Sequence, residues 1–462
     1  GDAREVLPTT DRSYDLIMSE PSNPYRAGIG SMFTQEFYQS VDERMADGGI
    51  FLQWVQAYEI DARTLRLIYT TLHSVFPHIE TWESQLGADL ILVATRKPLV
   101  HDLTWLQKRV AQEPFKRALR SVWGVRGVYG LFTGFVAGPD FARDLAKESP
   151  DEICTDDNSL VEFGFARSVG QNGLLNSQMV RTAAKDRNQH SPALKQAVGL
   201  DPVVIREWRQ IRFIGEGGRA ANLLGVGDKE ANQRQRARKA YADDKIQEAF
   251  TLWQQQPKAP DNLIDRMILA EGLAMTGNPD VLPLIEAIAA ESPVTADGLR
   301  TMYTTTIGDL PSAKTFLLRA LTNFQSDPWP LRKLISRLIT HGERLSSQDT
   351  VFAKEFVKVL ATPFAVGVEG KQRRMAHARV GLQVDFDNSC VEILSHFEPH
   401  PPWSYQVLKA RLKCYELNKH PLAEKAREDL EMFVASAAPR LFEVQEGQPA
   451  AAPPAAVPAT AP

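Results

Sequence analysis

A glutamate and several amide side chains stand directly after two short apolar segments of the chain. Glu20 opens the turn segment Glu-Pro-Ser-Asn-Pro after residues 14–19, and Gln53 and Gln56 lie at the end of the apolar residues 50–55. A glutamate held in a proline-flanked turn can act as a general base or bind a cation, and amides can position an amine. Glu20 can equally cap its turn by accepting from nearby backbone amides, and residue types alone leave the two roles evenly balanced.

Strand and helix patterns alternate around these residues. Apolar runs predict strands, and apolar residues at helical spacing after an N-cap such as Asp61 predict helices. The predicted strands cover residues 14–19, 50–55, 78–82 and 89–95, and the predicted helices cover residues 33–45 and 62–75. Such alternation indicates an α/β domain with a mostly parallel sheet covered on both faces, in which the first strand is buried. Because ligands bind such sheets at the carboxyl ends of the strands, we expect Glu20 and Gln53 in one crevice.

The pattern divides the chain into four predicted regions. Residues 1–98 form the α/β unit, and residues 99–225 form a mixed connecting segment that includes a helix near residues 103–122. Residues 226–436 are helical throughout, with Pro and Gly only between segments. Residues 437–462 are rich in Ala and Pro, which predicts a disordered tail.

The helical region shows weak self-similarity. Asp244, Gly277 and Gly308 follow one another at intervals of 33 and 31 residues. This spacing resembles that of tetratricopeptide repeats, whose paired helices pack closely through small residues and bind protein partners. We therefore expect a tetratricopeptide-like region that contacts a protein partner.

Composition excludes several classes of protein. The 462 residues include 53 basic and 57 acidic side chains, a net charge of −4 that does not indicate a nucleic-acid partner. No run reaches the roughly 18 apolar residues of a membrane-spanning helix. The three cysteines lie far apart, so we expect neither a zinc ribbon nor a disulfide framework. We expect the protein in a reducing compartment, the cytoplasm. Asp156 and Asp157 are expected to form a turn rather than a metal site, and no metal cofactor is predicted.

The first hundred residues also hold a series of short motifs in a fixed order. They are Gly1-Asp-Ala-Arg-Glu-Val-Leu7, Tyr14-Asp-Leu-Ile17, Glu20-Pro-Ser-Asn-Pro24, Phe33-Thr-Gln-Glu-Phe-Tyr38, Gly48-Gly-Ile50, Gln53 and Phe76-Pro77. In order and spacing they resemble the spermidine synthase family of polyamine aminopropyltransferases, which has the class I S-adenosylmethionine methyltransferase fold. The resemblance covers about a fifth of the chain, and the residues that follow are similar to bacterial spermidine synthase-like proteins with tetratricopeptide repeats.

The resemblance implies a role for individual residues. Asp2 and Ala3 stand where the family holds the adenine of the nucleoside. Glu20 stands at the place of the aspartate that deprotonates the attacking amine, and Asn23 at the place of the aspartate that binds the diamine. Gln53 matches a glutamine that lines the diamine pocket.

The chain also departs from the family. Glutamate at position 20 lengthens the arm of the base, and asparagine at position 23 removes an anion that pairs with an ammonium group. Since a hydrogen bond to a charged group contributes about 1.5–3 kcal/mol, we expect diamine affinity to be about ten- to a hundredfold lower. Glu59, Asp61 or Glu83 are alternative sources of the charge.

Two aromatic residues near the end of the second predicted strand have two interpretations each. Trp54 and Tyr58 can line a ligand pocket or fill the core. We predict a core position for Trp54 and a substrate-binding position for Tyr58.

The resemblance implies transfer of an aminopropyl group from decarboxylated S-adenosylmethionine to an amine, either putrescine or another polyamine. The alternatives are a methyltransferase-like enzyme with another acceptor, and a repeat scaffold with a degenerate transferase domain. A homodimer is a further expectation.

The family's glycine-rich loop and first three strands have no counterpart after Gly1. We therefore expect the chain to be a piece of a longer protein and to be inactive alone. Some similar proteins carry membrane helices upstream of this region, so an upstream membrane anchor is a further expectation.

Overall fold

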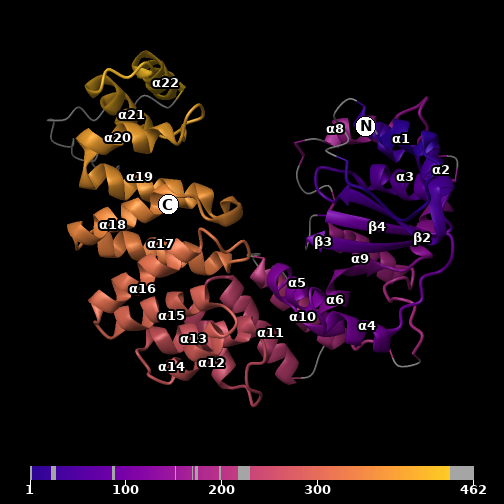
Figure 1. Cartoon of the computed structure of the whole chain (residues 1–462), viewed down its shortest axis with the longest axis horizontal. Helices are drawn as coiled ribbons and strands as arrows, with labels where there is room; N and C mark the ends of the chain where they lie inside the picture. The colour runs from indigo at the N-terminus through magenta and orange to yellow at the C-terminus, as the bar shows by residue number, and fades with distance from the viewer. Residues whose placement is uncertain are drawn as a thin grey trace, which may run out of the picture. The chain divides into compact units, whose positions relative to one another are not determined.

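The computed structural model describes residues 3–21, 28–85, 89–150, 152–168, 170–171, 175–196, 199–216 and 229–436. The chain divides into two compact units, Gly1–Gly272 and Leu273–Pro462, with the boundary inside helix α13 (Leu263–Met275). The first unit contains a five-stranded sheet, and all elements described in the second unit are helices (Figure 1). The predicted tail at 437–462 lies outside the described residues.

The sheet has the strand order β1-β2-β4-β3-β5. Its strands are β1 (Tyr14–Ser19), β2 (Met45–Gln56), β3 (His78–Gln85), β4 (Asp89–Thr95) and β5 (Phe135–Ala137). Only β1 and β2 pair in parallel, whereas β2 with β4, β4 with β3, and β3 with β5 pair antiparallel. The sheet is therefore mixed.

The expectation of a mostly parallel sheet was wrong. The pairing of β3 with β4 is antiparallel because the connection between them has only the three residues 86–88. A parallel pair needs a crossover of a dozen or more residues, so this connection can only join antiparallel strands. The connections that carry the helices α2 (Gln35–Arg44) and α3 (Ala62–His73) are long enough to return the chain in the same direction.

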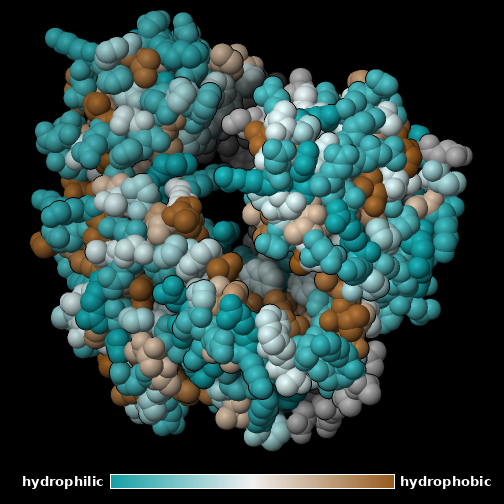
Figure 2. Space-filling view, turned by 45° about the vertical axis from the view of Figure 1, so that its right-hand side comes forward, coloured by the Kyte–Doolittle hydropathy of each residue, from teal (hydrophilic) through white to brown (hydrophobic). Residues whose placement is uncertain are grey.

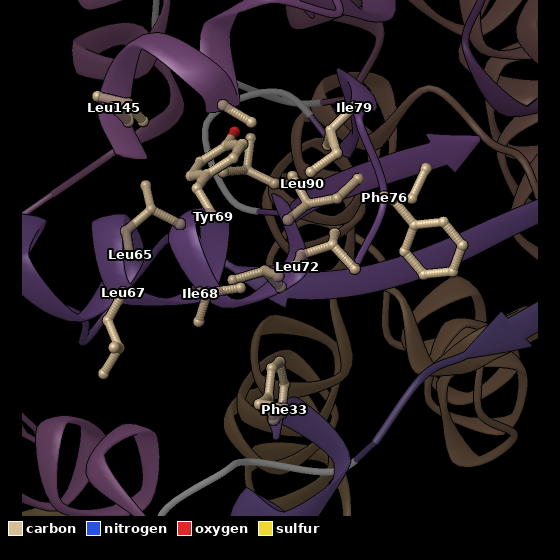
Figure 3. Packing of buried hydrophobic residues seen from close by; sticks show 14 of the residues in the cluster. Phe33, Leu65, Leu67, Ile68, Tyr69, Leu72, Phe76, Ile79, Leu90 and Leu145 are labelled. Atoms are coloured by element: carbon tan, nitrogen blue, oxygen red, sulfur yellow. The ribbon is translucent and has the colours of Figure 1, made fainter. Parts of the chain in front are cut away.

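One face of the sheet carries the main core of the first unit. Asp61 caps α3 by accepting from the backbone N–H of Thr64, as predicted. The buried side of α3 then packs against strand residues such as Ile79 and Leu90 (Figure 3). The N-terminal helix α1 (Ala3–Thr9), the 3-10 helix η1 (Ile29–Phe33), and the helices α7 (Phe141–Ala146), α8 (Leu160–Ser168) and α9 (Ser177–Asp186) complete this region.

The opposite face is covered at the β3 end. Trp82 of β3 packs there with Phe132 and Phe135. This aromatic cluster adjoins α4 (Leu103–Val110), α6 (Gly127–Leu131), the 3-10 helix η2 (Phe132–Gly134) and α10 (Pro202–Gly215). The helix expected near 103–122 is two helices, α4 and α5 (Phe115–Val122), because Pro114 cannot continue a helix.

The other end of this face is open at β1. Leu16 is 55% exposed and Met18 is 67% exposed. The prediction that residues 14–19 form a buried strand was wrong, because β1 is the edge strand of the sheet.

The rest of the described chain is built of helices. They are α11 (Lys229–Ala242), α12 (Ile246–Gln254), α13, α14 (Val281–Ala289), α15 (Pro293–Thr306), α16 (Leu310–Asn323), α17 (Arg332–Ser346), α18 (Thr350–Ala361), η3 (Ala365–Gly367), α19 (Gly370–Val384), α20 (Phe386–Ser395), α21 (Tyr405–Leu417) and α22 (Ala423–Ser436).

Short turns join successive helices of this region. Asp244, Gly277, Gly308 and Lys419 each have a positive φ, between 49° and 83°, in the turns after α11, α13, α15 and α21. A single left-handed residue is a common way to end a helix and turn the chain. The pattern of helix pairs agrees with the predicted region in outline, and its assignment to tetratricopeptide repeats stays a prediction.

Two of the three cysteines form a disulfide bond, contrary to the expectation from the sequence. Cys390 of α20 is bonded to Cys414 of α21, and both are fully buried. Their separation of 24 residues gave no sign of contact, because two adjacent helices bring them together. Since cysteines this far apart were the basis for a reducing compartment, the cytoplasmic location stays only a prediction.

Hydrophilic residues make up most of the molecular face in Figure 2, with hydrophobic residues dispersed among them. None of the described helices combines the length and apolar character of a bilayer-spanning segment.

Candidate active site

The carboxyl ends of β1 and β2 meet at one edge of the sheet. Ser19, the last residue of β1, is paired in register with Gln53 of β2. Glu20 follows Ser19 directly and is exposed. Glu20 thus follows the residue that pairs with Gln53, and their position in one crevice stays a prediction.

Three buried polar atoms at this edge have no hydrogen-bond partner within the described part of the chain. They are Ser19 Oγ, Gln53 Oε1 and Gln56 Oε1. The amide nitrogens of the two glutamines are used, since Gln53 Nε2 donates to the carbonyl of Trp54 at 3.0 Å and Gln56 Nε2 to that of Tyr58 at 2.9 Å. An unpaired buried acceptor costs about 1–3 kcal/mol, so a ligand that donates hydrogen bonds would be favoured here.

Asp89, at the start of β4, adds a second carboxylate to the edge. It is paired with Gln56 across the β2–β4 ladder, so the two side chains share a face of the sheet. Burial raises the pKa of Asp89 above its ordinary value, a hydrogen bond from the Trp54 side chain opposes this, and the charge of Glu20 adds to it. Glu20 and Asp89 therefore act on each other electrostatically.

The sequence analysis missed Asp89 because of the sheet direction. In a parallel sheet the first residue of a strand lies at the edge opposite to the carboxyl ends. Since β4 runs antiparallel to β2, its first residue lies beside the carboxyl end of β2 instead. The three-residue connection before Asp89 was the available signal.

The two aromatic residues lie close to this edge. Trp54 is only partly buried and its side chain bonds Asp89, so the prediction of a core position was wrong. Trp54 lies on the same face of the sheet as Trp82, because both pair with Ile91 of β4. Tyr58 is 41% exposed, in the turn that follows β2.

The alternative acidic residues have other partners. Glu83 is buried and pairs with Arg181 at 2.5 Å, and Asp61 caps α3. Glu59 Oε1 accepts from the backbone N–H of Gly170 at 3.3 Å. The carboxylates of Glu83 and Asp61 thus have structural contacts. Asp89 lies closer to Glu20 in the strand register than Glu83 does.

Asp2 and Asn23 lie outside the described residues, and Ala3 is the first residue of α1. Its neighbour Arg4 forms a two-bond ion pair with Asp156. The backbone N–H of Asp156 in turn donates to Glu36 of α2 at 3.0 Å. Asp156 lies in a turn, as predicted, and joins α1 to α2. Within the described residues no group of three or more potential ligands could hold a metal ion.

Comparison with known proteins gives one limited similarity. A polyamine aminopropyltransferase of Korarchaeum cryptofilum (strain OPF8) is 25% identical over 76 residues, which are 16% of this chain. The match covers 23% of the relative, so the chain spans about a quarter of that protein's length. No protein-family model matches the chain. No solved structure matches it either.

Proposed function

We propose that the first unit belongs to an aminopropyltransferase, which moves an aminopropyl group from decarboxylated S-adenosylmethionine to an amine acceptor. The observation that carries the proposal is the sheet edge with two carboxylates, Glu20 and Asp89. On the face of Asp89, the buried Gln56 Oε1 has no hydrogen-bond partner within the described residues, and neither have Ser19 Oγ and Gln53 Oε1 on the other face. The partial similarity to a polyamine aminopropyltransferase supports the same reaction class.

The edge suits a positively charged amine. Carboxylates and amide oxygens are hydrogen-bond acceptors, and an ammonium group has only donors. A cation near Glu20 and Asp89 would also relieve the repulsion between the two carboxylates. We propose that Asp89 supplies the charge that the family obtains from an aspartate at the position of Asn23.

Each proposed residue has one task in the reaction. The nucleoside supplies a carbon bound to a positively charged sulfur. The sulfur and the rest of the nucleoside leave together as neutral methylthioadenosine. Glu20 accepts a proton from the acceptor ammonium, whose pKa near 10 keeps it protonated at neutral pH, and so frees the nitrogen lone pair. The new C–N bond forms as the C–S bond breaks, and the electrons of the C–S bond stay on sulfur.

The other residues bind and orient the two substrates. Gln53 accepts from the acceptor amine through Oε1, and we assign amine binding to Asn23 and Tyr58 as well. Asp2 and Ala3 hold the adenine. An acceptor held in line with the C–S bond gains rate because little orientation is left to chance.

The test is a donor and acceptor panel with the natural protein at its full length. We expect methylthioadenosine release from decarboxylated S-adenosylmethionine only when a diamine or polyamine is present. Methyl transfer from S-adenosylmethionine to any acceptor, with no amine-dependent release, would favour the methyltransferase alternative. Failure to bind either nucleoside would favour a repeat scaffold with a degenerate transferase domain.

A further inference from the structure

Three arginines of the first unit converge on one threonine. Thr133, in η2, accepts at its carbonyl from Arg181 Nη2 at 3.1 Å and from Arg209 Nε at 3.4 Å. Its hydroxyl accepts from Arg212 Nη1 at 3.4 Å. Arg181 comes from α9 and the other two from α10, so separate helices supply the three guanidinium groups.

The backbone beside Thr133 leaves no room for a further side chain. A Cβ atom at Gly134 would lie 3.1 Å from the Trp123 ring and 3.4 Å from Arg212 Nη1. The guanidinium of Arg212 lies over the same ring, 3.7 Å from its centroid. Glycine at position 134 therefore allows the arginines to gather here.

The positive charges of this cluster exceed the negative ones. Arg181 pairs with Glu83 at 2.5 Å and Arg212 pairs with Glu216 at 2.8 Å. Arg209 has no carboxylate partner within the described residues. Three guanidinium groups thus face two carboxylates.

Arg209 keeps its charge in this setting. Burial and the neighbouring Arg181 lower the pKa of Arg209 to about 9, which leaves the group protonated at neutral pH. A buried charge is costly, and the attraction of Glu83 offsets only part of this cost, because the pKa of Arg209 is still lowered. Residue 209 as a whole keeps part of its surface exposed.

One acceptor atom of the cluster lacks a hydrogen-bond partner within the described residues. Glu83 is 2% exposed, and its Oε2 has no hydrogen-bond partner within the described residues. A ligand that satisfies both Arg209 and Glu83 must carry a negative charge and also a hydrogen-bond donor. Hydrogen phosphate and singly protonated phosphate esters have both, whereas sulfate and ionised carboxylates have no donor.

We propose that Arg181, Arg209 and Arg212 form a binding site for a phosphate group that keeps one proton. Arg209 presents a planar fork that matches phosphate oxygens. Glu83 Oε2 accepts the proton that phosphate donates. The site lies at the end of β3, which runs in the same direction as β2, so it shares the sheet edge with the candidate active site. The phosphate site does not depend on the proposed transfer reaction.

The first test is equilibrium dialysis of the 462-residue chain with inorganic phosphate, at constant ionic strength set by chloride. We expect saturable binding of one phosphate per chain and at least tenfold weaker binding of sulfate. Glycerol phosphate in a parallel series distinguishes free phosphate from a phosphate ester as the better ligand. No saturable binding of phosphate or its ester would overturn the proposal, and equal binding of sulfate would contradict the role of the phosphate proton.

Arg209→Gln removes the unpaired charge, and we expect it to weaken phosphate binding at least tenfold. Arg63→Gln is the matched control, because Arg63 lies in the same unit and its side chain is 71% exposed. We expect this control to bind phosphate within twofold of the parent chain. Equal losses in both variants, or no loss in either, would contradict the site.

Glu83→Gln offers a second test with the opposite sign. Glutamine can donate a hydrogen bond through its amide, so we expect sulfate binding to strengthen severalfold relative to phosphate. An unchanged preference for phosphate would show that Glu83 does not read the proton. The dialysis of the parent chain decides the matter if either variant does not fold.

Discussion

At the level of single residues, the candidate site depends on two carboxylates that lie near each other at one edge of the sheet. Ser19 and Gln53 fix this edge through the strand register, and Asp89 enters it because β4 is antiparallel. Residues that bind a cation are expected to destabilise the folded protein when no cation is bound, since like charges and unpaired oxygens raise the free energy of the folded state. The stability of variants at this edge therefore reports on its function.

Asp89→Asn is expected to raise the melting temperature at pH 7. Burial raises the pKa of Asp89, so the folded state binds this proton more tightly than the unfolded chain. The associated stability is present below the unfolded pKa of about 4 and is lost as pH rises through the folded pKa. Asparagine avoids this loss, so the variant should have the higher melting temperature at pH 7. Thermal unfolding at several pH values should show this difference disappear as pH falls toward 4.

Asp47→Asn is the control for this experiment. Asp47 is an exposed residue at 3.0 Å from Lys97, and a hydrogen bond from Lys97 lowers its pKa. Its replacement should leave the melting temperature at pH 7 unchanged or slightly lower. A gain in both variants, or a gain for Asp89→Asn that persists at low pH, would contradict the electrostatic account of this edge.

At the level of elements, close contacts between helices hold the second unit together. A Cβ atom at Gly342 of α17 would lie 2.1 Å from the Phe356 ring of α18, and one at Gly381 of α19 would lie 2.5 Å from Ile393 of α20. These positions require glycine for packing, although glycine is a poor helix former. The sequence rule that small residues let paired helices approach thus applies here.

Gly342→Ala is expected to destabilise the chain by about 1–3 kcal/mol, because the overlap with Phe356 exceeds the gain in helix propensity. The matched control is Gly370→Ala, at the start of α19, where nothing lies within 4 Å of the added atom. Urea unfolding measures both. The packing account is wrong if alanine at 342 is tolerated as well as alanine at 370.

Reduction of the disulfide is expected to lower the stability of the second unit. The bond closes a loop of 24 residues between Cys390 and Cys414, and loss of such a bond costs about 3 kcal/mol. A reductant should therefore lower the melting temperature of the parent chain. The double variant Cys390→Ser and Cys414→Ser should already have the lower value and should not respond to reductant, and a response there would assign the effect to Cys154.

Two histidines should make the second unit sensitive to acid. Burial lowers the pKa of His341 and of His377 to about 4, with Arg344 and His396 as further causes. In the neutral His341, Nδ1 accepts from Arg344 at 3.0 Å, so Nε2 carries the proton and donates to Thr305. The unfolded chain takes up these protons first, near pH 6.5, so stability is full above that pH and falls toward pH 4.

The measurement is the melting temperature between pH 7 and pH 4. The double variant His341→Gln and His377→Gln should lose less stability over this range than the parent chain. His400→Gln is the control, because His400 is exposed. Equal acid sensitivity of the parent and the double variant would exclude these two histidines as its cause.

At the level of the whole molecule, the sequence predicted an α/β region followed by helices, and the structure has that order. Apolar runs located β1 to β4, and Asp61 located the start of α3. Periodicity does not specify strand direction or strand order, because both depend on connection length and tertiary packing. For that reason the sequence placed Glu20 beside Gln53 but did not find Asp89.

Long-range contacts escaped the sequence for a related reason. The arginines around Thr133 lie 48 or more residues after it in the chain. Cys390 and Cys414 are 24 residues apart and belong to two different helices. No local pattern marks such contacts. They follow from the way the helices pack, which only the structure shows.

The central claim is that Glu20 takes a proton from an amine acceptor. The most direct test is amine-dependent release of methylthioadenosine by the natural protein at its full length and by its Glu20→Gln variant. Asp15→Asn is the control, because Asp15 is an exposed residue of β1, the strand that Glu20 follows. We predict that turnover falls about a hundredfold or more in Glu20→Gln and stays near the parent value in Asp15→Asn. Release that continues unchanged in Glu20→Gln would contradict the claim.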